Sequence, residues 1–277
     1  MKTLFLSLLF LFISNATDAQ LKDTNKAWNF SWGYNRAWFS NSDLHIKGGN
    51  KQDFTVYNVT AKDRPTKFTI KDYFGIQHIW IPQYNYRFGY RINKNWAISL
   101  GLDHMKYVMD NNQYAQVSGI ITPEASPKYA GTYLDTSMLI SQDFLKFEHT
   151  DGLNLLSFDA EYYIQLFVNK NNTLGIYLQS GVGGFFVIPR SDVRIFEKGL
   201  NNRFHLAGYC ITAKSGPEFR FYKRYFLRSQ IRVGGIYLPD VLTANDDPVR
   251  IEQGFTFLQW NVTAGFYFGF KKKVIAP

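Results

Sequence analysis

The feature that most constrains this chain is a strict alternation of apolar and polar residues near its C-terminal end. From Gln259 to Phe270, every second residue is apolar: Trp260, Val262, Ala264, Phe266, Phe268 and Phe270. The residues between them are polar or small, apart from Tyr267. Because successive side chains of a β-strand point to opposite faces, this segment predicts a strand with one apolar and one polar face.

The same period recurs along the chain in pairs of segments joined by short turns. One hairpin is predicted from Trp80 to Ile92, a turn at 93–95, and a second strand from Trp96 to Asp103. Two more hairpins are predicted over residues 156–188, with a turn at 169–172, and over 203–238, with a turn at 222–224. With an opening strand from Trp28 to Phe39, the strands number about eight.

Much longer segments separate these hairpins: residues 40–78, 110–153, 189–202 and 239–253. Short turns at one end and long loops at the other are typical of membrane β-barrels. The fragments 54–59, 114–121 and 132–140 also have strand character, and we expect them to extend the sheet beyond the membrane as hairpins. If they paired into the wall instead, the barrel would have about ten or twelve strands.

The composition agrees with half-buried strands. Aromatic residues make up 18% of the chain, but charged residues make up 19% and the mean hydropathy is only -0.23. Beyond the N-terminal segment no run of roughly 18 apolar residues occurs, so no spanning helix is predicted. A membrane protein without such helices must be a closed barrel. We therefore predict an all-β, antiparallel up-and-down transmembrane β-barrel with long external loops.

The N-terminal segment is typical of a secretory signal peptide. Lys2 precedes a short apolar stretch from Leu4 to Ile13, and small residues follow before Gln20. We expect residues 1–19 to be the signal peptide and residues 20–277 to form the barrel domain. The single cysteine, Cys210, cannot form an intrachain disulfide.

The C-terminal strand resembles the assembly-signal strand of bacterial outer-membrane proteins, which is rich in aromatic residues and alternates in the same way. The resemblance implies that the assembly machinery recognises Trp260, Phe266, Phe268 and Phe270. The family normally ends on the aromatic residue, whereas here a tail follows Phe270.

By its overall pattern the mature chain resembles the small outer-membrane β-barrel proteins of Gram-negative bacteria. This implies a monomer in the outer membrane, in contact with its lipid and lipopolysaccharide. The formal charge of +9 suits anionic lipid. The positive residues are scattered and carry no nucleic-acid-binding motif, so nucleic acid is not an expected partner.

The inward rows of the predicted strands collect ionisable residues of both signs. We expect them to form a plug of salt bridges in the narrow lumen, because buried charges persist only when they are paired. A narrow pore that prefers anions is the alternative. The set is Arg87, Arg91, Asp103, Asp159, Glu161, Lys214, Glu218, Arg220, Arg228 and Arg232.

Signals for catalysis are weak. The carboxylates Asp159 and Glu161 share a strand face, but the neighbouring cations would keep both ionised. The five histidines have no metal-ligand spacing, and we expect no metal or cofactor.

Some eight-stranded outer-membrane barrels are lipid A deacylases, with His and Ser two residues apart on a lipid-facing strand. Here Ala207 follows His205 at that spacing and Lys106 follows His104.

The outward His104, with Glu148 and Asp151 in the following loop, remains the one position where an outer-leaflet lipid-modifying enzyme could be sought. We expect instead a structural or surface-interaction role, with no enzymatic activity.

Overall fold

The computed structural model describes residues 25–49, 51–75, 77–199, 203–244 and 248–269. The predicted signal peptide at 1–19 and Phe270 of the predicted assembly signal lie outside these residues. The described chain is almost entirely antiparallel β-strand, with one short helix, α2 (Ile70–Phe74). No described helix has the length and apolar character needed to cross a membrane.

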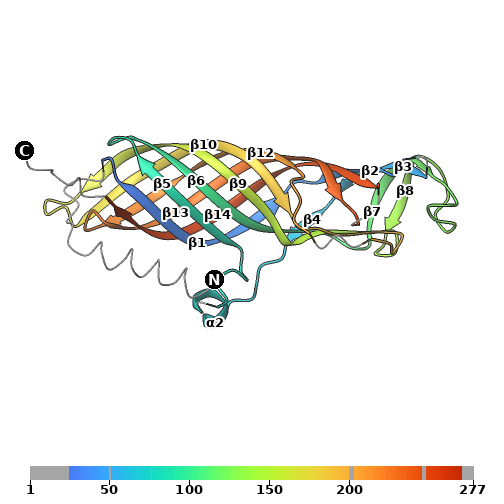
Figure 1. The fold of residues 1–277 in the computed structure, drawn as a ribbon, viewed down its shortest axis with the longest axis horizontal. Helices are drawn as coiled ribbons and strands as arrows, with labels where there is room; N and C mark the ends of the chain where they lie inside the picture. The colour runs from blue at the N-terminus through green and yellow to red at the C-terminus, as the bar shows by residue number, and fades with distance from the viewer. Residues whose placement is uncertain (1–24, 50, 76, 200–202, 245–247, 270–277) are drawn as a thin grey trace, which may run out of the picture.

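Eight strands close into a barrel, because β1 pairs with both β5 and β14. In order around the wall they are β1 (Trp28–Phe39), β5 (Tyr84–Arg91), β6 (Trp96–Met109), β9 (Leu145–Val168), β10 (Leu174–Pro189), β12 (Gly208–Phe221), β13 (Tyr225–Leu242) and β14 (Arg250–Phe268). Each strand follows its sequence neighbour in this ring and runs antiparallel to it. The predicted up-and-down barrel of eight strands is therefore confirmed (Figure 1).

The two ends of the barrel differ. Residues 92–95, 169–173 and 222–224 form short turns at one end, where Trp28 of β1 also lies opposite Phe268 of β14. We call this the turn end. The connections at the other end, the loop end, carry the remaining strands.

At the loop end, four further strands extend the sheet from residues 250–254 of β14, the part of this strand nearest the loop end. They are β2 (Ser42–Lys47), β3 (Gln52–Val59), β7 (Gln113–Ile121) and β8 (Gly131–Ile140), paired in that order. Two short strands complete this region: β4 (Ala61–Asp63) pairs with β6, and β11 (Asp192–Ile195) pairs with β9. The predicted hairpin extension is confirmed, and the fragments do not enter the barrel wall.

The long loops expected at 110–153 and 239–253 were a wrong interpretation. β9 already begins at Leu145, β13 runs to Leu242 and β14 begins at Arg250. In these parts the inward row is apolar, with Leu145 and Phe147 on β9, Val241 on β13 and Ile251 on β14 buried. An apolar inward row breaks the polar-inside alternation that identified the other strands.

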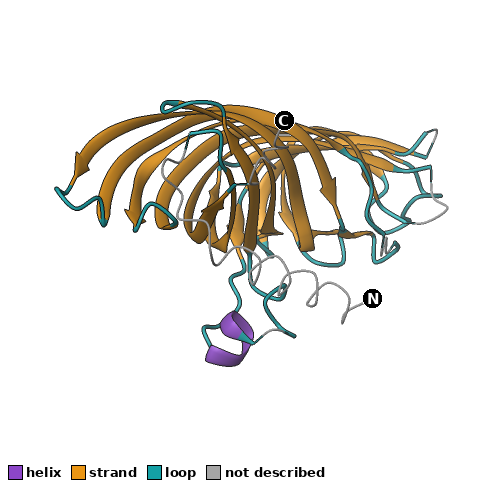
Figure 2. Cartoon of the chain, turned by 60° about the vertical axis from the view of Figure 1, so that its left-hand side comes forward, coloured by secondary structure: helices purple, strands orange, loops and turns teal. Residues whose placement is uncertain are grey.

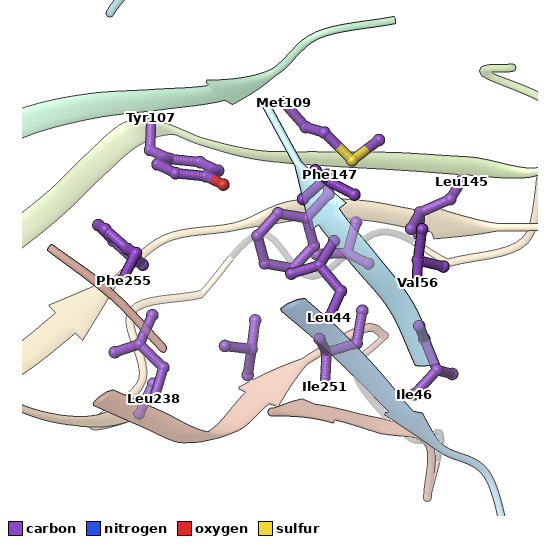
Figure 3. Packing of buried hydrophobic residues seen from close by; sticks show 14 of the residues in the cluster. Leu44, Ile46, Val56, Tyr107, Met109, Leu145, Phe147, Leu238, Ile251 and Phe255 are labelled. Carbon is purple, nitrogen blue, oxygen red and sulfur yellow. The ribbon is translucent and has the colours of Figure 1, made fainter. Parts of the chain in front are cut away.

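The interior consequently has two layers. Toward the turn end it contains the charged residues described below. Toward the loop end it is a hydrophobic core shared by the barrel strands and the added strands. Figure 3 shows Leu44, Ile46, Val56, Phe147 and Ile251 from both groups of strands packing together.

Candidate functional site: the lumen charge network

The ten charged residues predicted to face the lumen are all buried, with exposed fractions of 7% or less. Strand register places them there. On β6 and β9, for example, Asp103, Asp159 and Glu161 alternate with the outward Leu100, Leu102, Phe158 and Ala160. The sequence pattern thus located these side chains, although their role as a plug is a proposal.

The larger of two clusters is built around Asp159. Its Oδ2 accepts hydrogen bonds from Lys214 Nζ and Arg232 Nη2, both at 2.7 Å, and lies 3.6 Å from Arg87 Nε. Arg232 on β13 also reaches Asp103 on β6, with Nη1 and Oδ2 3.1 Å apart. Because β6 and β13 lie on opposite sides of the ring, this ion pair crosses the bore.

Lys214 joins the remaining carboxylate to this cluster. Its Nζ lies 2.6 Å from Glu161 Oε1, and Ser99 Oγ donates a hydrogen bond to the same oxygen at 2.7 Å. Arg87 also pairs directly with Asp103. Three cations and three carboxylates from five strands therefore share one buried network.

The second cluster is built around Glu218 and lies nearer the turn end. Arg220 Nε and Arg228 Nε donate to its two oxygens at 3.0 and 2.6 Å. The hydroxyl of Tyr267 donates to Glu218 at 3.0 Å. Tyr163 links the clusters, because its hydroxyl donates to Glu161 at 3.0 Å and accepts from Arg228 Nη2 at 3.1 Å.

Arg91 lies apart from both clusters. Its guanidinium stacks 4.1 Å from the centroid of the Tyr163 ring and donates to the carbonyl oxygen of Lys94. Among the described residues it makes no ion pair. The alternation placed this side chain correctly in the interior, but the cation contacts an aromatic ring and a backbone carbonyl.

Two glycines make room for the network. A Cβ built on Gly101 would lie 1.5 Å from Arg87 Nη1, and one built on Gly183 would lie 2.0 Å from Asp159 Oδ1. Both glycines face inward at the level of the larger cluster. Any side chain here would displace the charged groups.

The network has ion pairs and hydrogen bonds but lacks the arrangement of a catalytic site. Each carboxylate is engaged by at least two donors, and a nucleophile beside a free base is not found within the described part of the lumen. The described residues also contain no group of three or more His, Cys, Asp or Glu side chains suited to a metal ion.

The lipid-modifying site considered at His104 is not assembled. His104 is only 7% exposed, because its ring stacks on Tyr84 at 4.8 Å and its Nδ1 lies 2.8 Å from Asn154 Oδ1. Glu148 pairs with Arg64 and Lys146, and Asp151 pairs with Arg190. His104 is covered because residues of neighbouring strands pack over this part of the wall.

A buried histidine that the sequence pattern did not single out, His149, lies in the hydrophobic core of the loop end. His149 Nδ1 lies 2.7 Å from Ser191 Oγ, and its Nε2 lies 3.3 Å from Gln253 Oε1. Burial lowers the pKa of His149 to about 4, so the ring is neutral at pH 7. Both members of the His–Ser pair are enclosed, so we assign the histidine to the packing of the core.

The three described residues of the predicted assembly signal, Trp260, Phe266 and Phe268, lie on the outer face of β14. Trp260 is 44% exposed and its Nε1 donates to Ser229 Oγ at 3.0 Å. Phe266 packs against Phe30, and Phe268 against Phe88, across strand boundaries. Recognition of this strand by assembly machinery stays a prediction.

The comparisons with known proteins give structures but no family. No family model matches the chain, and no curated protein matches it. The chain is similar to the outer membrane protein OprG from Pseudomonas aeruginosa, with 10% identity over 91% of this chain and 100% of that one, at a TM-score of 0.38. It is similar to Ail, the attachment invasion locus protein of Yersinia pestis, with 9% identity over 88% and 99%, at a TM-score of 0.35.

A third similar structure is the Neisserial surface protein A, with 11% identity over 89% of this chain and 98% of that one, at a TM-score of 0.31. These structural neighbours are small bacterial outer-membrane barrel proteins. The architecture of the present chain is established by its own strand pairing.

Proposed function

We propose that this protein is a monomeric barrel of the bacterial outer membrane, with a closed lumen and a folded surface domain at its loop end. The observation that carries the proposal is the distribution of apolar and charged side chains, which is the reverse of that in a water-soluble protein. Large apolar side chains such as Leu100, Phe158, Ile211 and Trp260 are exposed on the outer wall, while ten charged residues are buried within it. Lipid is the solvent that such an outer face fits.

The height of the apolar belt supports this solvent. On β14 the outward apolar residues run from Leu258 to Phe268. At roughly 3.4 Å per residue and a tilt of roughly 40°, this stretch rises by roughly 26 Å, close to the band of a membrane barrel. Aromatic side chains lie at its ends, with Trp28 and Phe268 at the turn end and Tyr237 toward the loop end. Such girdles are typical of the two membrane interfaces.

The interior supports a closed lumen rather than a pore. Cations and carboxylates alternate within salt-bridge distance, and the bore is filled again by the hydrophobic core toward the loop end. A selective pore is instead lined by one sign of charge or by polar groups around open water.

The loop end supports a role in surface interaction. The hairpin of β7 and β8 is held by the core yet exposes large side chains, with Tyr114 at 75% and Leu134 at 83%. Exposed apolar residues on a rigid sheet are common where proteins meet partners. In the proposed orientation this hairpin lies outside the cell, and lipopolysaccharide and lipid surround the barrel below it.

The membrane assignment can be tested with purified protein and vesicles. We expect the protein to float with lipid vesicles and to leave a protease-resistant barrel. Recovery as a soluble monomer without detergent would contradict the membrane assignment.

The surface role needs a separate test on cells. Cells that carry Tyr114→Ser and Leu134→Ser should adhere less well than cells with the unchanged chain, at equal surface amounts. Equal adherence would leave only the structural role.

A further inference from the structure

The connection between β4 and β5 exposes an unusual number of large apolar side chains. We call residues 64–75 and 77–83 the lateral arm. Its exposed apolar residues are Phe68 at 69%, Ile70 at 75%, Phe74 at 62%, Trp80 at 48% and Ile81 at 40%. Single exposed apolar residues are ordinary on proteins, but a group of this size on one short connection indicates a contact surface.

The lateral arm is attached to the outer wall of the barrel. Tyr73 of α2 is only 6% exposed, and its ring packs edge-on against Tyr34 of β1 with centroids 4.7 Å apart. The hydroxyl of Tyr73 donates to the carbonyl oxygen of Thr66 at 2.9 Å. Lys106 Nζ on β6 donates to Thr66 Oγ1 and to the carbonyl oxygen of Ile81, both at 3.1 Å. These contacts fix the position of the arm relative to two barrel strands.

The attachment point lies where the apolar belt meets the polar part of the wall. On β1 the outward residues are aromatic from Trp28 to Tyr34, and Tyr34 is in register with Tyr84 at the start of β5. The next outward residue on β1 is Arg36, whose Nη2 lies 3.4 Å from the Tyr73 hydroxyl. In Figures 1 and 2, α2 projects sideways from the barrel, away from the end that carries β7 and β8.

The charge of the arm suits the headgroup region of a membrane. Lys67 and Lys71 are exposed beside Phe68 and Ile70, and Arg36 and Lys106 lie at the base of the arm. Aromatic and apolar side chains combined with cations are typical of segments that lie in the plane of an anionic lipid interface.

We propose that the lateral arm is a lipid-interface anchor: Phe68, Ile70, Phe74 and Trp80 enter the outer leaflet beside the barrel, and Lys67 and Lys71 contact anionic lipid headgroups. The inference rests on the proposed membrane function. The arm would fix the depth and rotation of the barrel in the membrane at one side of its wall.

Site-directed spin labelling can test this anchor. Cys210 is buried and is first replaced by Cys210→Ala, and a nitroxide is then attached in three separate variants: Ile70→Cys on the arm, Leu100→Cys on the belt and Leu134→Cys on β8. Each variant is placed in vesicles of phosphatidylcholine with or without phosphatidylglycerol. Collision rates with oxygen, which concentrates in lipid, are compared with those of a water-soluble nickel complex.

We expect the labels at Ile70 and Leu100 to collide several-fold more often with oxygen than with nickel, and the label at Leu134 to show the reverse. If the Ile70 label behaved like that at Leu134 while the Leu100 label stayed in lipid, the anchor would be refuted and the barrel assignment would stand. If the Leu100 label were also in water, the membrane assignment itself would fail.

The headgroup contact has its own control. With phosphatidylglycerol the Ile70 label should lie deeper than in phosphatidylcholine alone, and the double variant Lys67→Gln, Lys71→Gln should lose that difference. An unchanged difference in the double variant would overturn the role of the two lysines.

Discussion

Asp159 holds more of the lumen cations than any other single carboxylate. It accepts hydrogen bonds from Lys214 and Arg232 and lies within ion-pair distance of Arg87. Because these cations are buried, removal of the carboxylate would leave them desolvated with one partner fewer. Removal of one partner from a buried ion pair usually costs more than the pair contributes, since the remaining charge keeps its desolvation penalty.

Asp159→Ala should therefore lower the free energy of unfolding by about 3 to 5 kcal/mol. Urea-induced unfolding in lipid vesicles would measure the change. Asp53→Ala is a control at an exposed carboxylate, because Asp53 Oδ1 also has a side-chain partner, His45 Nε2 at 2.7 Å, but its side chain is 69% exposed. We expect that control to change stability by less than about 1 kcal/mol, and equal effects would show that the lumen network is not desolvated.

His149 gives the hydrophobic core of the loop end a dependence on pH. Its pKa is lowered from 6.5 to about 4, mainly because burial disfavours the charged ring. The unfolded chain thus binds a proton that the folded chain does not, and stability falls as the pH drops from 6.5 to about 4. The loss should level off at about 3 kcal/mol below that range and vanish above pH 7.

Thermal unfolding between pH 4 and pH 7 would detect this loss. His149→Gln should flatten the curve over that interval, because the substitution removes the titrating ring. A curve of the same slope in His149→Gln would assign the effect to other groups.

At the scale of elements, β6 and β8 offer two leucines with different surroundings. Leu100 on β6 is 50% exposed and Leu134 on β8 is 83% exposed in the isolated protein. In the proposed orientation the bilayer covers Leu100 and leaves Leu134 in water. Leu100→Arg should cost about 2 to 4 kcal/mol in a bilayer if it lies near the midplane, because the charge then faces hydrocarbon.

Leu134→Arg is the matched control and should change stability by at most about 0.5 kcal/mol, because its side chain faces water. Both variants would be compared by urea-induced unfolding in the same vesicles. If the two substitutions had equal effects, the outer face of β6 would not be in lipid.

The strands could be predicted from the sequence because apolar and polar residues alternate wherever the two faces of a strand contact different surroundings. Prediction from this alternation therefore gave the correct face for Leu100, Asp159 and Arg232, and with it the residues that fill the lumen. It missed the parts of β9 and β14 at the loop end. There Phe147 and Phe255 face a hydrophobic core, so the inward residues are no longer polar. It also could not show that Arg91 stacks on Tyr163, because alternation fixes a face and not a partner.

At the scale of the whole molecule, the interior contains two closures in series. The charge network fills the bore toward the turn end, and the hydrophobic core, which includes Met105, Phe147, Leu238 and Phe255, fills it toward the loop end. The same strands β6, β9, β13 and β14 pass through both layers. A substitution that opens one layer would leave the other layer in place, and that layer would still block the path of an ion.

This arrangement predicts that stability and conductance respond differently to a single change. Asp159→Ala should lose stability as described above, yet give no single-channel current in a planar bilayer, because the hydrophobic core still excludes water from the path. The unchanged protein should also be silent. A known outer-membrane pore inserted in the same bilayer would control for detection. If Asp159→Ala conducted steadily while keeping its unfolding midpoint, the charge network would be a gate and the interior could not be sealed twice.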